Sequence, residues 1–380
     1  MSEWKTYKLG ELPIQFIDGD RGKNYPKGDD FSKVGHCLFL NAGNVTKNGW
    51  DFSENVYISE EKDNLLRNGK LERGDIVLTT RGTVGNVVLY TDDIPYKHIR
   101  INSGMVIIRN NNTCYNPYLY QYLRSYLFLG QVQQFQSGSA QPQIPISTLK
   151  KLTISLPPLA EQKRIADILS AIDDKIELNH RINTNLEQQA QALYKSWFVD
   201  FEPFGGKMPE DWREGTLGEI MTITSGKHPK NRVSIKTKDV NIPIVGAADI
   251  IGYTNEMLYS TPILIIGRVG THGIVQRLST KCWPSDNTLV IQTKYYEMCY
   301  QLLKQIDYKK LNRGSTQPLI TQTDIKGVEI IIPPIEILEE YENRVSILFH
   351  SINNYDIENS TLSALRDTLL AKLMSGEIDV

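Results

Sequence analysis

Residues 157–198 read PPLAEQKRIADILSAIDDKIELNHRINTNLEQQAQALYKSWF, and the spacing of their apolar side chains sets the architecture of the chain. One seam of the expected helix holds Leu169, Ile176, Asn183 and Ala190, and the alternating seam holds Ile165, Ile172, Asn179, Leu186 and Leu193. Spacings of three and four residues sustained over about four heptads are typical of a coiled coil. About 38 residues at ~1.5 Å each make a helix of ~55–60 Å. This stretch therefore predicts a long helix that pairs with another helix along its seam.

The same helix pattern recurs 176 residues later in the chain. Pro157-Pro158 recurs as Pro333-Pro334, and the seam recurs as Tyr341, Val345, Leu348, Ile352, Tyr355, Asn359, Leu362 and Leu369. Asn183 and Asn359 occupy matching seam positions. An asparagine there can lock the register of a coiled coil, or it can be a tolerated polar layer, and the spacing does not separate these two interpretations.

The segments before the two helices are also related. Trp4…Leu9-Gly10-Glu11-Leu12 recurs as Trp212…Leu217-Gly218-Glu219-Ile220, Arg81-Gly82-Thr83-Val84-Gly85 recurs loosely as Arg268-Val269-Gly270-Thr271-His272-Gly273, and Gly138-Ser139-Ala140-Gln141-Pro142 recurs as Gly314-Ser315-Thr316-Gln317-Pro318. Matches in the same order along the chain indicate an internal duplication.

Each copy begins with a β-rich globular part. Short apolar runs bounded by Gly, Asp and Asn predict strands at 76–80, 105–108, 263–266 and 288–291, with closing strands at 153–156 and 328–332. Residues 118–129 and 295–305 are predicted to be helical. The expected domains are 1–156, a helix at 157–204, a second globular domain at 205–332 and a second helix at 333–380. The fold class is α+β, with two α/β domains separated by two long helices in a pseudo-two-fold repeat.

The connectivity predicts how the helices run. The second globular domain begins where the first helix ends, so the second helix must return along the first to pair with it. We therefore expect an antiparallel coiled coil with the two globular domains at its opposite ends.

Composition excludes several classes of protein. Of the 380 residues, 40% are apolar and 23% charged, and no run approaches the ~18 apolar residues of a membrane span, so a cytoplasmic protein is expected. Cys37, Cys114, Cys282 and Cys299 lack metal-finger spacing and are expected to be reduced. Residues 159–197 hold five basic and six acidic side chains, and residues 335–380 hold three and nine, so with a net charge of −2 the rest of the chain carries about +5. The predicted globular domains are thus modestly basic.

Catalytic motifs are missing from the sequence. It contains no Gly-x4-Gly-Lys-Ser/Thr phosphate loop and no His-Glu-x-x-His or paired-cysteine metal pattern. The Pro-Pro pairs lack the amide and the aromatic residue of an amino-methyltransferase motif. The triplet Glu161-Gln162-Lys163 could mimic a nuclease carboxylate-lysine pair, but at the start of a coiled-coil helix we interpret it as a solvated helix face. The chain is predicted to be non-catalytic, without metal or cofactor of its own.

Three kinds of loop are candidates for binding double-stranded DNA, because phosphates require cations and base edges require amide or guanidinium groups. They are basic loops after the first strand of each domain, glycine-rich turns with a projecting arginine, and polar Ser/Gln loops. The candidate residues are Arg21, Lys23, Asn24, Lys27, Arg81, Ser139 and Gln141 in the first domain, and Lys227, His228, Lys230, Arg268, His272, Arg313, Ser315 and Gln317 in the second.

The runs Pro157–Ala166 and Leu193–Phe204, with the ending Leu369–Ile378, resemble the conserved regions of type I restriction-modification specificity (S) subunits. The resemblance covers essentially the whole chain. It implies two target recognition domains that read one half each of a split DNA site, and helices that act as a ruler between the halves. It also implies two methyltransferase subunits and added restriction subunits as partners, to which S-adenosylmethionine, ATP and Mg²⁺ belong. One departure is that 335–340 lacks the Ala-Glu-Gln-Lys pattern of the first helix.

Two other classes of function remain as alternatives. A methyltransferase or nuclease fusion would need a catalytic motif that the sequence does not show, and the length leaves no space for a methyltransferase domain. A coiled-coil scaffold without a DNA role would explain the helices but not the repeated Gly, Gln and Arg loops. Salt-dependent, sequence-selective DNA binding separates the scaffold from the specificity subunit.

Overall fold

The computed structural model describes residues 4–111, 114–135, 142–269, 273–311, 313 and 319–378. It divides into two compact units. The first unit combines Met1–Leu178 with Glu358–Val380, and the second is Asn179–Ile357. Each unit therefore contains one globular domain and about half of each long helix, α5 (Leu159–Phe198) and α10 (Ile335–Ser375).

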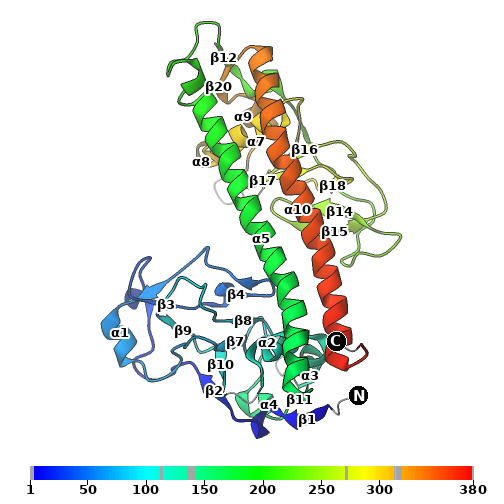
Figure 1. The fold of residues 1–380 in the computed structure, drawn as a ribbon. Coiled ribbons are helices and arrows are strands. Elements are labelled where there is room, and N and C mark those ends of the chain that lie inside the picture. The colour runs from blue at the N-terminus through cyan, green and yellow to red at the C-terminus, as the bar shows by residue number, and fades with distance from the viewer. Residues whose placement is uncertain are drawn as a thin grey trace. The chain divides into compact units, whose positions relative to one another are not determined.

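The globular domain of the first unit is built on a four-stranded antiparallel sheet (Figure 1). Its order is β2 (Ile14–Asp18), β10 (Met105–Asn110), β7 (Ile76–Thr79) and β8 (Val87–Leu89). A smaller sheet has the order β6 (Tyr57–Ile58), β3 (Cys37–Phe39) and β9 (Ile99–Arg100), and two pairs join β1 (Lys5–Lys8) to β11 (Thr153–Leu156) and β4 (Val45–Thr46) to β5 (Gly49–Trp50). The helices of the domain are α1 (Glu60–Leu65), α2 (Asn116–Arg124), α3 (Tyr126–Phe135) and α4 (Ile146–Leu149).

The second unit repeats the main sheet, the smaller sheet and the β1–β11 pair of the first unit, and its described residues contain no counterpart of the β4–β5 pair. Its main sheet has the order β13 (Thr222–Ser225), β19 (Thr288–Gln292), β16 (Ile263–Gly267) and β17 (Val275–Leu278), and β12 (Arg213–Thr216) pairs with β20 (Glu329–Ile332). The smaller sheet has the order β15 (Ile250–Thr254), β14 (Ile242–Val245) and β18 (Trp283–Pro284). The helices are α6 (Leu217–Ile220), α7 (Tyr296–Gln305), α8 (Tyr308–Leu311) and α9 (Gln322–Lys326). The duplication predicted from the sequence is confirmed.

Because the side chains of the central strands point alternately to the two faces of the sheet, each domain has two hydrophobic cores. Successive side chains of a strand point to opposite faces of its sheet. On β7, Ile76 and Leu78 join the core under α2, α3 and the long helices, whereas Val77 joins a second core with residues of the small sheet. Leu264 and Ile265 divide in the same way on β16. The four-stranded sheet is therefore a middle layer that is buried on both faces.

The long helices are antiparallel within each unit, as predicted. In the first unit Ile165 and Leu169, near the start of α5, share a core with Leu373 near the end of α10. In the second unit the end of α5 packs on the start of α10, where the Trp197 and Tyr341 ring centroids are 5.7 Å apart. The seam positions predicted from the heptads are buried or half-buried in both helices. None of the helices in the described ranges is long and apolar enough to cross a membrane.

One of the seam asparagines of the second unit, Asn183, makes hydrogen bonds across the helix pair. Asn183 Nδ2 on α5 donates to Asp356 Oδ1 at 2.8 Å and to the carbonyl of Ile352 at 3.4 Å on α10. A shift by one heptad would break both bonds. This geometry favours the register lock over a merely tolerated polar layer at Asn183.

One sequence prediction about the helices was wrong, and another was incomplete. Residues 118–129 are helical as predicted, except that Ser125 is extended (ψ 155°) between α2 and α3 and its hydroxyl donates to the carbonyl of Tyr122 at 2.7 Å. The start of α5 is not a solvated face, because Glu161 and Gln162 are buried. Glu161 accepts from Trp4 Nε1 at 3.2 Å, and Gln162 accepts from the backbone N–H of Tyr115 at 2.9 Å. These side chains attach the helix to its own globular domain.

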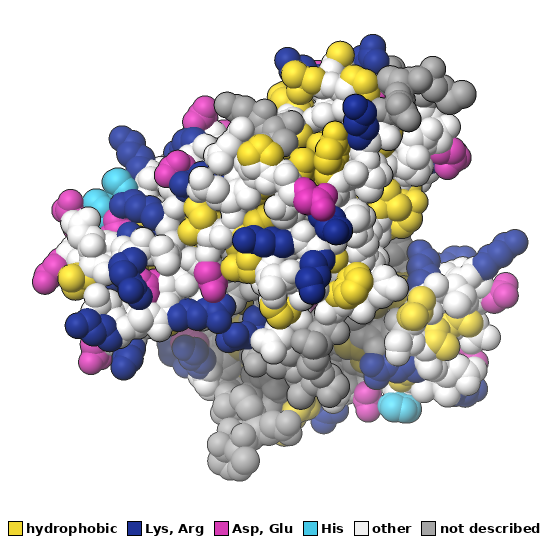
Figure 2. Space-filling model, turned by 90° about the horizontal axis from the view of Figure 1, so that it is seen from below, with side chains coloured by type: hydrophobic (Ala, Val, Ile, Leu, Met, Phe, Trp, Pro, Cys, Tyr) yellow, Lys and Arg dark blue, Asp and Glu magenta, His cyan; other side chains and the backbone are white. Residues whose placement is uncertain are grey.

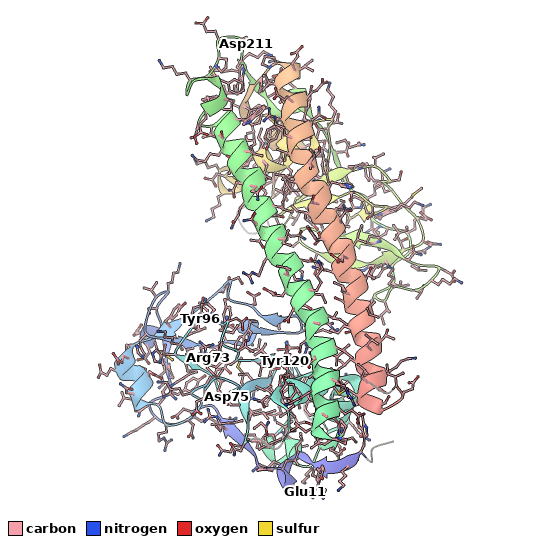
Figure 3. All side chains as sticks on the ribbon, in the orientation of Figure 1. Glu11, Arg73, Asp75, Tyr96, Tyr120 and Asp211 are labelled. Atoms are coloured by element: carbon pink, nitrogen blue, oxygen red, sulfur yellow. The ribbon has the colours of Figure 1, made fainter. Side chains whose placement is uncertain are left out.

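Arginines tie the irregular segments of the first domain to its sheets. Arg73, labelled with Tyr96 and Asp75 in Figure 3, donates to the carbonyls of Ile94 and Tyr96 at 3.0 and 3.3 Å. Arg109 on β10 donates hydrogen bonds to both carboxylate oxygens of Asp75, at 2.8 and 2.7 Å. These bonds fix the crossover between β8 and β9 and the turn before β7.

A buried ion pair joins sheet and helix in the second unit. Arg277 Nη2 on β17 lies 2.5 Å from both carboxylate oxygens of Glu297, and its guanidinium carbon is 3.7 Å from the centroid of the Phe349 ring on α10. Glu342 of α10 accepts from the backbone N–H groups of Glu297 and Met298 at 3.1 and 2.8 Å. Burial and the Glu342 carboxylate outweigh the attraction of Arg277 and raise the pKa of Glu297 to about 7.

This shift predicts a pH dependence of stability. Between pH 4.5, the usual pKa, and about 7, folded Glu297 holds a proton that the unfolded chain has released, so the free energy of unfolding falls as pH rises. Glu297→Gln, which does not titrate, is expected to remove about 1–3 kcal/mol of this fall. Urea unfolding from pH 5 to 8 measures it, with exposed Glu336→Gln on α10 as the matched control. If the free energy of unfolding changes with pH equally in Glu297→Gln and in the parent protein, the raised pKa of Glu297 is contradicted.

Candidate nucleic-acid interface

The predicted DNA-binding segments of the first domain leave the same end of its central sheet. β2 and β7 are both antiparallel to β10, and the register places Asp18 opposite Val106 and Thr79 opposite Met105. The last residues of β2 and β7 therefore lie beside the first residues of β10. The segments that follow them, which carry Arg21 and Arg81, therefore start at the same end of the sheet, one on each side of β10.

The second domain has the same arrangement. Ser225 ends β13 opposite Leu289, and Gly267 ends β16 opposite Thr288, at the start of β19. The segments that carry Lys227 and Arg268 begin there. The duplication has thus built the same cluster of loops twice, once in each unit.

Equivalent glycines open the basic loops. A Cβ at Gly19 would lie 2.3 Å from the carbonyl oxygen of Asn102, and one at Gly226 would lie 2.1 Å from that of Ser285. Such contacts exclude any side chain at these two positions. The loop β2–β3 (19–36) and the loop β13–β14 (226–241) are therefore matched from their first residue.

The basic side chains of loop β2–β3 differ in their exposure and in the bonds that they already make within the protein. Lys23 and Lys27 are exposed. Arg21 is 55% exposed, donates to the carbonyl of Ser103 at 3.1 Å and lies 3.2 Å from Asp18. The half-buried Asn24 donates its amide to the carbonyl of Leu65 at 3.2 Å, so reading a base would require it to give up that bond.

The cations of loop β13–β14 are freer. Lys227, His228 and Lys230 are all exposed, and His228 Nδ1 is 3.8 Å from Asp286. The indole Nε1 of Trp283 donates to the carbonyl of Lys227 at 2.7 Å, which fixes the backbone and leaves the side chain in solvent. This loop also carries Arg232, Lys236 and Lys238, all exposed, against a single acid, Asp239.

The sequence alignment of the two arginine turns was wrong by one residue. Arg81 forms an isolated bridge with Gln143, whereas its counterpart in the second domain, paired with Leu319, is Val269. Arg268 instead matches Thr80, since Ile144 donates to the carbonyl of Thr80 and Ile320 to that of Arg268, both at 3.0 Å. Neighbouring residues in extended chain point to opposite sides. Exposed Arg81 and half-buried Arg268 are therefore not equivalent side chains.

The third predicted segment meets the arginine turns. The bridges to Gln143 and Leu319 place its described edge beside Arg81 in one domain and Val269 in the other. Arg313 is 65% exposed and paired with Asp324, whose pKa is lowered because hydrogen bonds from Thr321 and the charge of Arg313 outweigh its burial. The remaining candidates Ser139, Gln141, His272, Ser315 and Gln317 lie outside the described residues.

The sequence reasoning overlooked the segment that both the basic loop and the arginine turn of each domain contact. In the first domain it is Asn102-Ser103-Gly104, where Gly104 accepts from the N–H groups of Thr80 and Arg81 at 2.7 and 3.2 Å. Its counterpart in the second domain is Ser285-Asp286-Asn287, and Asn287 accepts from Arg268 N–H at 2.8 Å. A small polar turn just before a buried strand is a common pattern, so its sequence alone did not mark it.

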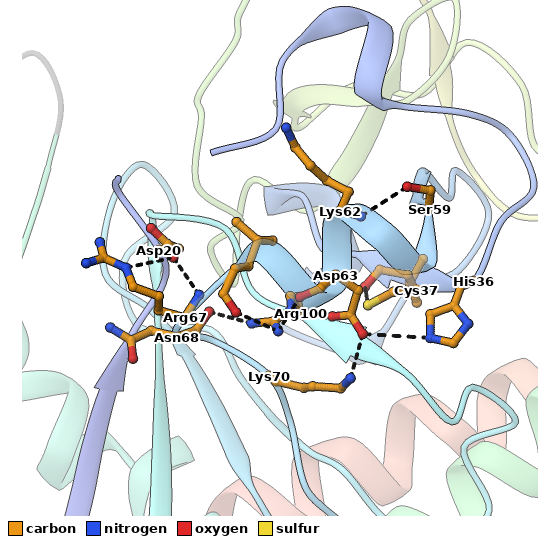
Figure 4. A network of polar contacts seen from close by, with 12 residues as sticks. Asp20, His36, Cys37, Ser59, Lys62, Asp63, Arg67, Asn68, Lys70 and Arg100 are labelled. Carbon is orange, nitrogen blue, oxygen red and sulfur yellow. Dashed lines mark hydrogen bonds and ion pairs between the residues drawn. The ribbon is translucent and has the colours of Figure 1, made fainter. Parts of the chain in front are cut away.

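A buried charge network supports loop β2–β3 from behind (Figure 4). The Asp63 side chain is fully buried, pairs with Arg100 and accepts from Lys70 Nζ at 2.5 Å. Arg100 also donates to the carbonyls of Asn68 and Leu66 at 2.8 and 3.1 Å. These bonds position the segment in which Arg67 N–H donates to Asp20 at 2.8 Å. Asp20 also accepts from Gly22 N–H at 2.7 Å, and these two backbone bonds lower its pKa.

Three residues of this region are placed where they could hold a metal ion. One ligand atom each of His36, Asp63 and His98 lies within 4.8 Å of the others, and the two imidazole rings are stacked with centroids 4.2 Å apart. The Asp63 oxygen that faces His36 Nε2 at 3.7 Å is the one bonded to Lys70. An ion would have to displace that ammonium, so the carboxylate is already satisfied within the protein.

The surface of the molecule mixes charges of both signs. In the view of Figure 2, Lys and Arg side chains stand among Asp, Glu and apolar groups.

A cavity of about 760 Å³ in the second unit is lined by Arg277, Glu297 and His350, and also by Pro262 and Ser279 at the end of the sheet away from the loops. A raised carboxyl pKa in a cavity is a feature of active sites. Here burial and the neighbouring Glu342 carboxylate account for the raised pKa of Glu297, and its carboxylate is already paired with Arg277.

Comparison with known proteins gives consistent matches. The family model described as the type I restriction modification DNA specificity domain matches residues 1–188 and 209–366. The chain is 28% identical to the type I restriction enzyme MjaIX specificity subunit of Methanocaldococcus jannaschii over 86% of this chain and 84% of that protein. It is 26% identical to the HindI specificity subunit of Haemophilus influenzae over the whole of both chains.

A solved structure shares the fold. The crystal structure of the type I restriction-modification S subunit from M. genitalium matches 98% of this chain and 96% of that chain, with a TM-score of 0.61 and 18% sequence identity. Each of the two family matches contains one globular domain and most of the helix that follows it. The chain therefore belongs to the family of type I restriction-modification DNA specificity subunits, which are recognition rather than catalytic components.

Proposed function

We propose that the chain reads a split, asymmetric DNA sequence, with one loop cluster on each half, and directs methyltransferase and restriction subunits to it. The observation that carries this proposal is the duplicated cluster at the end of the central sheet, built twice with different side chains. Equal topology gives both units the same way of meeting a duplex, and different residues let them read different bases. Because its substrate is cellular DNA, we place the complex in the cytoplasm.

The partners supply the chemistry in this proposal. Two methyltransferase subunits would bring S-adenosylmethionine, and restriction subunits would bring ATP and Mg²⁺. The chain would contribute phosphate contacts from cations such as Lys23, Lys227 and Lys230, which are exposed in both basic loops. Binding through phosphates is salt-dependent, so affinity is expected to fall as the salt concentration rises.

Mapping methylated bases in the source genome, with the gene intact and deleted, tests the proposal. Deletion is expected to abolish methylation at one split motif, and wild-type complementation to restore it. Lys227→Ala/Lys230→Ala should restore less methylation at every copy of the motif, because lost phosphate contacts weaken binding without changing the sequence read. Exposed Lys207→Ala, between α5 and β12, is the matched control. An unchanged set of methylated motifs after deletion would overturn the proposal.

The role of the helices as a ruler has a separate test. Inserting seven residues after Leu178 in α5 and after Ile357 in α10 keeps the heptad phase and adds ~10 Å to the helix pair. The gap between methylated half-sites is expected to grow by about three base pairs, since one DNA turn of ~10.5 base pairs spans ~35 Å. An insertion in α5 alone, which shifts the register, should abolish methylation. A stable matched variant that retains the original gap would show that the helices do not measure distance.

A further inference from the structure

The two most exposed large apolar side chains among the described residues are Val34 and Ile235, at 80% and 77%. The next value is 66%, for Ile347. Single exposed apolar residues are ordinary on protein surfaces. The position of these two is what distinguishes them, because Val34 lies in loop β2–β3 and Ile235 in loop β13–β14, the matched basic loops.

The two side chains occupy the same place in the repeated fold. Ser32 forms an isolated antiparallel bridge with Tyr57 of β6, and Val233 forms one with Tyr253 of β15. β6 and β15 are the equivalent edge strands of the two small sheets. In each domain the exposed apolar residue comes two positions after this bridge. Ser32-Lys33-Val34 and Val233-Ser234-Ile235 have no identical residue at matching positions, so the sequence repeat did not show the correspondence.

Hydrogen bonds hold the backbone next to both residues in place. Ser32 and Tyr57 exchange backbone hydrogen bonds at 3.0 and 2.9 Å, and the Ser32 hydroxyl donates to the carbonyl of Val34 at 2.5 Å. In the second domain Val233 and Tyr253 exchange bonds at 2.9 and 2.8 Å. Valine and isoleucine are branched at Cβ and therefore stiff at χ1. A stiff apolar group on a fixed loop is suited to a shape-specific contact.

Cations accompany each apolar residue. Lys33 directly precedes Val34, and Lys236 directly follows Ile235, and both lysines are exposed. A lysine beside an apolar tip allows one loop to hold a phosphate while the tip reaches a base edge.

We propose that Val34 and Ile235 each contact the C5-methyl group of a thymine in the major groove, one in each half-site. The methyl group is the apolar feature that distinguishes thymine there, and apolar side chains are what recognise it. This inference rests on the proposed function and assigns one specificity-determining position to each domain.

The test replaces thymines by deoxyuridine, which lacks only that methyl group. The full-length chain with its methyltransferase subunits is titrated with duplexes carrying the mapped motif, with thymines replaced one at a time. In each half-site one replacement is expected to weaken binding about fourfold, the effect of one buried methyl. Val34→Ala should weaken binding of normal DNA by a similar factor and abolish the effect in one half-site only. Ile235→Ala should do the same in the other.

Two controls keep the outcomes distinct. Met257→Ala removes a 52% exposed side chain of the second unit outside these loops and should leave every uracil effect unchanged. Thermal unfolding of each variant verifies that the fold is intact. If the uracil effects are the same in Val34→Ala, in Ile235→Ala and in the parent, or if no thymine responds, the thymine assignment is overturned while sequence-specific binding still supports the proposed function. If the parent complex shows no sequence preference, the proposed function fails as well.

Discussion

Asp63→Ala is expected to lower the free energy of unfolding of the first unit by about 3–5 kcal/mol. The substitution leaves Arg100 as a buried charge without its carboxylate, since the Arg100 side chain is only 6% exposed. Breaking a buried pair from one side costs far more than the pair itself contributes, because the remaining ion has been removed from water. Urea unfolding measured by tryptophan fluorescence and circular dichroism gives the change.

The matched control for this prediction is Asp29→Ala, which removes an exposed carboxylate from loop β2–β3 in the same domain. It should change stability by less than about 0.5 kcal/mol. A double variant, Asp63→Ala with Arg100→Met, removes both charges and is expected to regain a large part of the loss. If the double variant is no more stable than Asp63→Ala, unpaired charge is not the cause of the destabilisation.

Asp173→Ala is expected to destabilise the first unit by about 3 kcal/mol, because it removes the common partner of two half-buried arginines. Asp173 on α5 is 2.6 Å from Arg124 of α2 and 3.1 Å from Arg366 of α10, and Gln121 donates to it at 2.8 Å. The carboxylate thereby joins the globular domain to both long helices. Tyr120, labelled in Figure 3, covers this site with its ring 4.9 Å from the Arg124 guanidinium.

The same carboxylate predicts the direction of a pH effect. Burial alone would raise the pKa of Asp173, but the charges and hydrogen bonds of Arg124, Gln121 and Arg366 outweigh it and lower the pKa below 3.8. A lowered pKa stabilises the fold above the ordinary carboxyl range and loses that contribution as pH falls through it. Asp173→Ala should therefore flatten the loss of stability in acid. Asp167→Ala, an exposed position on the same helix, is the control, and an equal effect of the two substitutions would contradict the prediction.

The two copies make this junction in different ways. By the repeat offset, Asp173 of α5 corresponds to Phe349 of α10. The first unit places a carboxylate between two arginines there, whereas the second packs the Arg277 guanidinium on the Phe349 ring and pairs it with Glu297. Backbone topology survived the divergence of the copies, because the hydrophobic layers tolerate many side chains at their edges.

The spacing of apolar residues along the sequence was sufficient to predict the architecture. The heptads predicted the two long helices, and the apolar runs predicted the central strands β7, β10, β16 and β19 to within two residues. Such patterns are local, since burial of a helix stripe or of a strand on both faces leaves its period in the sequence. The duplication was visible for the same reason, and it required an antiparallel helix pair.

Side-chain placement depended on contacts between distant segments. Glu161 and Gln162 looked solvated because nothing near them in sequence shows that Trp4 and the backbone of Tyr115 bind them. Arg81 and Arg268 looked equivalent because their motifs align, whereas one residue of register separates them in the sheets. A shift of one residue changes the face of a strand without changing its composition.

The sequence by itself determined the repeat, the helix pair, the β-rich domains and the positions of the basic loops, because each leaves a periodic or compositional trace. Only the tertiary structure showed that the basic loop and the arginine turn of each domain start at the same end of its sheet, that Asp63 and Arg100 support loop β2–β3, and that Val34 matches Ile235. Those facts follow from strand pairing across long separations, which brings residues together without any local signal in the chain.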